Sequence, residues 1–148
     1  MMDVHFMSKK QNWATPPDLF ESLHEEFNFD IDVCAERWNA KLPTFWTLED
    51  DCLSKSWIGL RCFMNPPYGR EIKRFIEKAS TSDANLVVAI LPARTDTKYF
   101  HDYIYNKAEI RFIKGRVCFH TEEGAGASAP FPSMIVIWRN NNEYAKVN

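Results

Sequence analysis

The stretch of this 148-residue chain that is best suited to chemistry is Asn65-Pro66-Pro67-Tyr68, which follows the short apolar run 61–64. Each proline fixes its own φ, lacks an N–H and biases the preceding residue away from helix. The pattern therefore predicts a strand that ends in a rigid, extended polar turn. The side-chain oxygen of Asn65 and the backbone carbonyl of Pro66 can each accept one hydrogen of a planar amine, while the ring of Tyr68 stacks on it. Such a turn suits methylation of a weakly nucleophilic amine through positioning and fixed dipoles, without a strong base.

The tetrapeptide matches the Asn/Asp-Pro-Pro-Tyr/Phe signature of amino-group methyltransferases that use S-adenosylmethionine. In its wider pattern the chain resembles the phage-type DNA N6-adenine methyltransferases, the Dam family. The resemblance is carried by ordered blocks between about residue 12 and residue 138: Trp13-x-Thr15-Pro16, Asp30-x-Asp32-x-Cys34-Ala35, Asn39-x-Lys41, Asp50-Asp51, Asn65-Pro66-Pro67-Tyr68, Leu91-Pro92-Ala93-Arg94-x-Asp96-Thr97 and Gly115-Arg116-x-x-Phe119. This ordered set is more specific than the tetrapeptide by itself.

Strand patterns alternate with helical patterns along the chain, and the loops that carry candidate site residues all follow strands. We expect strands over 27–33, 43–47, 61–64, 85–91, 109–114 and 133–138, and helices after an N-cap at Thr15, over 72–79, and after Asp96 or Thr97. This alternation indicates a three-layer α/β/α domain with a mostly parallel sheet. The resemblance implies the Rossmann-like methyltransferase fold with a terminal antiparallel hairpin. We expect one domain over 12–139, a flexible tail over 1–11 and a polar tail over 140–148.

The resemblance also implies a site for S-adenosylmethionine at the carboxyl ends of the strands, where open α/β sheets bind ligands. Its expected residues are Thr15, Pro16, Asp32, Cys34, Ala35 and one of the pair Asp50 and Asp51. A carboxylate of that pair can accept hydrogen bonds from the ribose hydroxyls or the adenine amine, and the sequence does not separate the two. No Gly-x-Gly follows the first strand, so the site depends on the resemblance. A helix cap at Thr15 and a solvated acidic turn at 49–51 are the plain structural alternatives.

The reaction that the resemblance implies is methyl transfer to N6 of adenine in DNA, with Asn65, Pro66, Pro67 and Tyr68 at the amine. The base must leave the duplex to reach such a pocket, so the expected partner is double-stranded DNA with its target adenine flipped out. The candidate DNA contacts are Arg70, Lys73, Arg74, Arg94, Arg116 and Phe119. The alternatives are an ordinary solvated basic face and, for Phe119, packing in the core.

Composition narrows the function classes further. The net charge of −2 argues mildly against a dedicated high-affinity nucleic-acid binder. No apolar run approaches the roughly 20 residues that span a bilayer, and the N-terminus has no secretory pattern, so we expect a cytoplasmic protein of a bacterial host if it is phage encoded. The four cysteines are irregularly spaced, which disfavours a zinc site, and no metal is expected.

Two other functions stay open at this point. One is a methyltransferase for another planar amine, in an RNA base or a protein glutamine. The other is a catalytically inactive DNA-binding module of the same fold. The sequence does not indicate the recognition sequence, the oligomeric state or the biological role.

Overall fold

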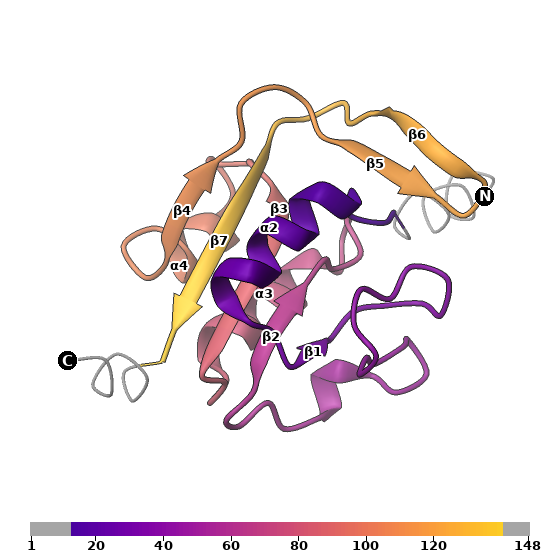
Figure 1. Ribbon diagram of the computed structural model, residues 1–148. Coiled ribbons are helices and arrows are strands. Elements are labelled where there is room, and N and C mark those ends of the chain that lie inside the picture. Colours follow the sequence, from indigo (N-terminus) through magenta and orange to yellow (C-terminus); the bar gives the residue numbers. More distant parts are fainter. Residues whose placement is uncertain (1–12, 141–148) are drawn as a thin grey trace.

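The computed structural model describes residues 13–140, so the expected tail over 1–11 and all but Asn140 of the expected tail over 140–148 lie outside the described residues. The elements follow one another in this order: α2 (Pro17–Phe27), β1 (Ile31–Asp32), the 3-10 helix η1 (Cys52–Ser54), β2 (Arg61–Met64), α3 (Ile72–Thr81), β3 (Leu86–Pro92), α4 (Lys98–Tyr103), β4 (Glu109–Phe112), β5 (Cys118–Thr121), β6 (Gly124–Ser128) and β7 (Ser133–Arg139). Figure 1 shows them along the chain.

The main sheet has the strand order β1-β2-β3-β7-β4. β1, β2 and β3 are parallel neighbours, whereas β7 is antiparallel to both β3 and β4. β4 therefore points in the same direction as β1, β2 and β3, and the carboxyl ends of these strands share one edge (Figure 1). The fold is thus mixed α/β, with the last strand inserted antiparallel into the sheet.

A separate antiparallel hairpin, β5–β6, is inserted between β4 and β7. Because β4 ends and β7 begins at the carboxyl edge, the hairpin projects from that edge (Figure 1). It also holds the segment before α2. The Ala14 N–H donates to the His120 carbonyl at 2.8 Å, and the His120 N–H donates back at 2.9 Å.

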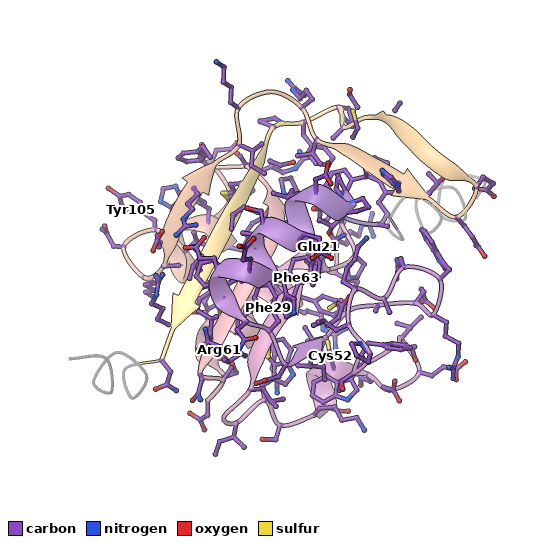
Figure 2. All side chains as sticks on the ribbon, viewed as in Figure 1. Glu21, Phe29, Cys52, Arg61, Phe63 and Tyr105 are labelled. Atoms are coloured by element: carbon purple, nitrogen blue, oxygen red, sulfur yellow. The ribbon has the colours of Figure 1, made fainter. Side chains whose placement is uncertain are left out.

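Two buried clusters lie on opposite faces of the sheet. Because side chains alternate along a strand, Met64 of β2 joins the cluster under α3 and α4, while its neighbour Phe63 joins the cluster under α2. Figure 2 shows Phe63 and Phe29 beside α2. Their ring centroids lie 5.5 Å apart. All of β3 is buried, as its continuous apolar run predicts for a strand covered on both faces.

The end of α2 explains why the first predicted strand is wrong in length. The sequence favours a strand over 27–33, but α2 continues through Phe27 and only Ile31–Asp32 is extended. Asn28 closes the helix in the left-handed region, at φ 55°, and donates its N–H to the His24 carbonyl. The Arg61 Nε then donates to the Phe27 carbonyl at 2.8 Å, which ties this helix end to β2.

Of the other predictions for secondary structure, some are wrong and some are confirmed. Over 43–47 there is a single parallel bridge, between Asp32 and Phe45, in place of the predicted strand. Thr15 is not the helix N-cap, because Pro16 occupies that position without a side-chain bond. The predicted cap at Thr97 is confirmed, since its hydroxyl accepts from the Phe100 N–H at 3.3 Å. The strands over 61–64, 85–91, 109–114 and 133–138 and the helix over 72–79 are confirmed within a few residues.

Candidate active site

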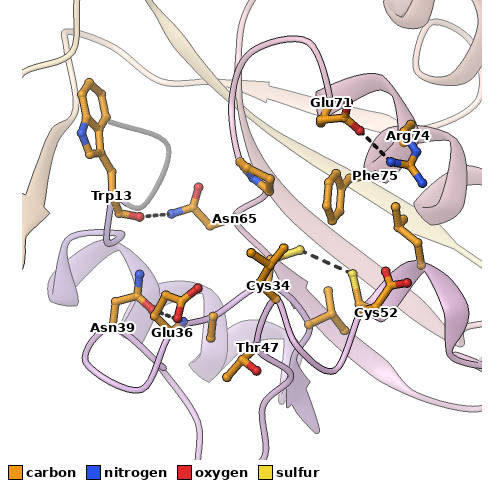
Figure 3. Close-up of a pocket in the computed structure, with 16 residues that line it drawn as sticks. Trp13, Cys34, Glu36, Asn39, Thr47, Cys52, Asn65, Glu71, Arg74 and Phe75 are labelled. Atoms are coloured by element: carbon orange, nitrogen blue, oxygen red, sulfur yellow. Dashed lines mark hydrogen bonds and ion pairs between the residues drawn. The ribbon is translucent and has the colours of Figure 1, made fainter. Parts of the chain in front are cut away.

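A pocket of about 350 Å³ lies at the carboxyl edge of the sheet, beside the turn that follows β2. Its walls come from the chain after β1, the loop around η1, the Asn-Pro-Pro-Tyr turn and the first turns of α3 (Figure 3). The lining includes the apolar side chains of Val33, Leu53 and Phe75 and the carboxylates of Glu36 and Asp51. The pocket therefore combines flat apolar walls with a few hydrogen-bond acceptors, as small-molecule sites do.

Asn65 stands at one side of this pocket with its amide orientation fixed. Its Nδ2 donates to the Trp13 carbonyl at 2.9 Å and to the Thr15 hydroxyl at 3.2 Å. A backbone carbonyl only accepts hydrogen bonds, so the amide nitrogen must face it. The amide oxygen is consequently turned away from the Trp13 segment (Figure 3).

The rest of the turn is equally constrained. Pro66 is buried, and Pro67 lines the pocket. The Tyr68 hydroxyl donates to the Ile90 carbonyl of β3 at 3.0 Å, and burial raises its pKa well above the usual range. Tyr68 therefore stays protonated, and its ring is held in place by β3.

Tyr68 belongs to an aromatic cluster that also contains Trp13, Phe119 and Phe131. Tyr68 meets Phe119 and Phe131 edge-on, with centroids 6.1 and 5.5 Å apart. Trp13 is stacked on Phe131 at 6.3 Å and tilted against Phe119 at 5.4 Å. Sequence reasoning missed Phe131, and the only signal for it is an aromatic residue between two prolines ahead of the last strand.

Phe119 lies inside the core cluster under α2, with 1% of its surface exposed. Its expected stacking on a base needs an accessible ring face, which this position does not offer. The structure instead places Phe119 edge-on to Tyr68, where it supports that ring. Core packing, the alternative weighed from the sequence, describes its position.

The expected cofactor residues separate into two groups. Cys34, Ala35 and Asp51 line the pocket. Thr15 and Asp32 border a neighbouring recess of about 10 Å³, which Cys34 and Asn65 also line. Pro16 and Asp50 line neither cavity.

This grouping distinguishes Asp50 from Asp51, which the sequence left equivalent. Asp50 points back into its own turn, where its Oδ2 accepts from the Thr47 N–H at 2.8 Å and the Thr47 hydroxyl at 3.2 Å. The backbone bond from Thr47 holds the pKa of Asp50 below its usual value. Asp51 instead lines the pocket, with its backbone in the left-handed region at φ 55°. Asp51 is thus the carboxylate available to a ligand.

Asp32 is buried, with 2% of its surface exposed. Its carboxylate accepts from the backbone N–H of Lys41 at 3.1 Å and of Cys34 at 3.4 Å. Both oxygens face the protein's own backbone, so Asp32 braces the loop that forms one wall of the pocket. Burial raises the pKa of Asp32 to about 7, although the two N–H groups oppose that shift.

This raised pKa predicts a particular dependence of stability on pH. The folded state binds the Asp32 proton more tightly than the unfolded chain does, so the group's contribution is most favourable below pH 3.8 and is lost as pH rises towards about 7. We expect the difference in unfolding free energy between wild type and Asp32→Asn to change over that window, by at most roughly 4 kcal/mol, and to be constant above it. Urea unfolding of both proteins from pH 4 to 8 measures this difference. Parallel curves would contradict it.

The five basic residues among the candidate DNA contacts are all exposed. Arg70, Lys73, Arg94 and Arg116 are exposed, and the Arg94 guanidinium lies 5.7 Å from the centre of the Phe131 ring. Arg74 lines the pocket and forms an exposed ion pair with Glu71 at 2.7 Å. Arg74 therefore lies beside the pocket and on the basic face of α3.

Asn39, from the Asn39-x-Lys41 block, braces the loop after β1, because its side-chain oxygen accepts from the Glu36 N–H at 2.7 Å. Two other features of the pocket escaped sequence reasoning. Phe75 forms an apolar wall from α3. Cys34 and Cys52 bring their sulfur atoms to 3.8 Å of each other at the pocket. These residues come together only through tertiary contacts, so no local spacing indicates them.

A pocket of cofactor size beside an Asn-Pro-Pro-Tyr turn is the arrangement of an amino-group methyltransferase. The family model described as DNA N-6-adenine-methyltransferase (Dam) matches residues 5–147. The chain is 32% identical over 147 residues to a DNA N-6-adenine-methyltransferase of Haemophilus phage HP1 (strain HP1c1), covering 95% of this chain and 85% of the relative. It is 30% identical over 107 residues to a protein of the same name from Escherichia phage T1, covering 69% of this chain and 44% of that relative. The chain belongs to the DNA N-6-adenine-methyltransferase (Dam) family, which confirms the resemblance seen in its motifs.

Proposed function

We propose that this protein transfers the methyl group of S-adenosylmethionine to N6 of adenine in double-stranded DNA. Membership of the family supports the reaction and the DNA substrate. The observation that carries the proposal is the amide of Asn65. Its nitrogen is fully engaged by Trp13 and Thr15, while its oxygen is turned away from them beside the pocket.

The pocket suits the proposed methyl donor. Its volume of about 350 Å³ lies within the range of roughly 300–1,000 Å³ of small-molecule sites. Asp51 and Glu36 supply acceptors for ribose hydroxyls, and Leu53 and Phe75 supply apolar surface for a purine. The closely packed Cys34 and Ala35 let the ligand approach the backbone. S-adenosylmethionine bound there supplies an electrophilic methyl group.

At the amine, the residues of the turn act by position. The Asn65 oxygen and the Pro66 carbonyl each accept one N–H of the adenine amine, which favours a pyramidal nitrogen with an available lone pair. Within residues 13–140, no hydrogen bond reaches the Pro66 carbonyl, so it is available for this contact. The nitrogen would form its bond to the methyl carbon as the bond from that carbon to the donor sulfur breaks, which leaves the donor as a neutral thioether, and would then release one of its two protons to water. Neither acceptor has to take up that proton, because the methylated ammonium is strongly acidic.

The target base reaches this turn by leaving the duplex. Tyr68, fixed by its bond to Ile90 and supported by Phe119, is placed to stack on the extruded adenine. Arg70, Arg94 and Arg116 follow the carboxyl ends of β2, β3 and β4, so they surround the same edge of the sheet. Together with Lys73, they form a basic rim suited to phosphate contacts.

Arg94 gives a direct test of that rim. We expect Arg94→Ala to weaken DNA binding several-fold and to reduce the slope of log Kd against log salt concentration by about 1. Fluorescence anisotropy with a labelled duplex at several salt concentrations measures both quantities. Lys107→Ala is the control, because Lys107 lies in the turn between α4 and β4 and bonds to the Asp102 carbonyl. Equal slopes for Arg94→Ala and wild type would remove Arg94 from the interface.

We also propose that the α/β architecture is a compact version of the Rossmann-like methyltransferase fold, formed by one domain over 12–139. Helices on both faces of the sheet and a last strand inserted antiparallel between β3 and β4 support this assignment. Within residues 13–140, no helix is long and apolar enough to cross a membrane.

The substrate class is tested by competition. Purified protein is incubated with a methyl-labelled donor and with equal masses of duplex DNA, structured RNA and unfolded protein. We expect label in DNA alone. Label in RNA or in protein glutamine would shift the proposal to that amine, and absence of both transfer and donor binding would indicate an inactive DNA-binding module.

A further inference from the structure

The proposed reaction depends on which way the Asn65 amide points. The oxygen and nitrogen ends of an asparagine amide are nearly equal in size, and its terminal torsion is broad and roughly two-fold. An amide oxygen that faces the adenine amine accepts a hydrogen bond from it. An NH₂ group in the same place would bring its own N–H donors against those of the amine. The orientation therefore has to be enforced by the protein.

The Trp13 carbonyl, which only accepts, sets the orientation from the side opposite the expected amine, and the Thr15 hydroxyl adds a second bond that holds the amide in this plane. The Trp13 carbonyl lies 2.9 Å and the Thr15 hydroxyl 3.2 Å from Asn65 Nδ2, so both N–H groups have a partner. If the amide were flipped, its oxygen would face the Trp13 carbonyl at hydrogen-bond distance with no hydrogen between them. The two N–H groups, which are partly buried, would also lose their acceptors, at a cost in free energy.

Thr15 is itself held rigidly. It is buried, with 1% of its surface exposed, and its β-branched side chain has few rotamers. On one side Pro16 fixes the backbone at φ −56°. On the other side Ala14 exchanges two hydrogen bonds with His120 of β5, at 2.8 and 2.9 Å. The hydroxyl is thus presented to Asn65 by a segment anchored to the hairpin.

The place of Thr15 favours this role over a contact with the methyl donor. It borders the small recess of about 10 Å³, which also contains Asp32 and Lys41, rather than the large pocket. A recess of that size holds no more than about one water molecule. Asn65 borders both cavities, as Trp13, Cys34 and Asn39 do, and its Nδ2 bonds to the Thr15 hydroxyl.

We propose that Thr15 is a positioning residue of the methyl transfer: its hydroxyl, with the Trp13 carbonyl, keeps the Asn65 amide oxygen facing the target adenine amine. This inference rests on the proposed function. It assigns to Thr15 an effect on the rate of transfer, and none on the affinity for the methyl donor or for DNA.

The test compares Thr15→Val and Thr15→Ala, which remove the hydroxyl with and without loss of packing volume, with Thr15→Ser, which keeps it. Single-turnover methyl transfer is measured at saturating donor and DNA, together with the Kd of each ligand. We expect Thr15→Val and Thr15→Ala to slow transfer by roughly 10-fold, with both Kd values within about 2-fold of wild type. Thr15→Ser should recover most of the rate.

A double variant tests whether Thr15 acts through Asn65. In the Asn65→Ala background, Thr15→Ala should cause no further loss of the residual rate, because the group that it positions is gone. An unchanged rate in the single variants, or a weakened donor Kd with an unchanged rate, would overturn the proposal. Failure of wild type to methylate DNA would instead count against the proposed function, so the two failures are distinguishable.

Discussion

Asn65→Ala is expected to reduce methyl transfer to DNA by at least about 10²- to 10³-fold, the usual cost of removing a fixed dipole that acts on the reacting group. The reason is geometric. The Asn65 oxygen is the side-chain acceptor that the turn presents beside the pocket, and its nitrogen is already bonded to Trp13 and Thr15. No neighbouring side chain in the turn replaces it, because Pro66 and Pro67 have none that accepts hydrogen bonds.

The same variant should remain folded. It removes the hydrogen bonds that the amide donates to the Trp13 carbonyl and the Thr15 hydroxyl. This loss lowers the free energy of unfolding by roughly 1–2 kcal/mol. Single-turnover rates and urea unfolding of the same preparation separate the two effects. Asn65→Asp keeps an oxygen at the amine and should retain more activity than Asn65→Ala, although its second oxygen meets the Trp13 carbonyl with no hydrogen between them and should lower the stability. Wild-type rates for Asn65→Ala would remove this residue from the chemistry.

Asp51→Asn is expected to weaken binding of S-adenosylmethionine by roughly 10- to 100-fold, the range for losing a charge-assisted hydrogen bond. Asp51 lines the pocket at φ 55°, and asparagine tolerates that left-handed backbone, so the change removes charge without adding strain. Isothermal titration calorimetry with the methyl donor measures the affinity directly.

Asp50→Asn is the matched control at the adjacent position. Asp50 is exposed, faces Thr47 and does not line the pocket, and an asparagine oxygen can accept the same bond from the Thr47 N–H. We therefore expect its donor affinity to stay within about 2-fold of wild type. A larger loss from Asp50→Asn than from Asp51→Asn would reverse our assignment of the two carboxylates.

The sequence predicted best those features that depend on local patterns. The run 85–91 is apolar at nearly every position, which a strand covered on both faces requires, and β3 occupies Leu86–Pro92. The paired prolines at 66–67 fix an extended turn through their own ring geometry, without any contact from distant parts of the chain. The turn and its strand were therefore predictable, and so was the family, because its motifs are short and ordered.

Features that depend on distant contacts were not predictable. The Thr15 hydroxyl looks like a helix cap in the sequence, because nothing local shows that Asn65 lies beside it. Asp50 and Asp51 are identical residues, and only the backbone geometry of the turn separates them. Asp32 lies at a strand end where a ligand contact is expected, yet burial turns its oxygens towards the backbone of Cys34 and Lys41.

The central claim is methylation of adenine N6, and mass spectrometry of nucleosides tests it most directly. Unmethylated duplex DNA is treated with purified protein and S-adenosylmethionine, digested to nucleosides and analysed alongside DNA treated with Asn65→Ala. We predict that N6-methyladenine appears with wild type and is absent or reduced by at least about 10²-fold with the variant. A different methylated nucleoside, or none from a protein that still binds the methyl donor, would contradict the account.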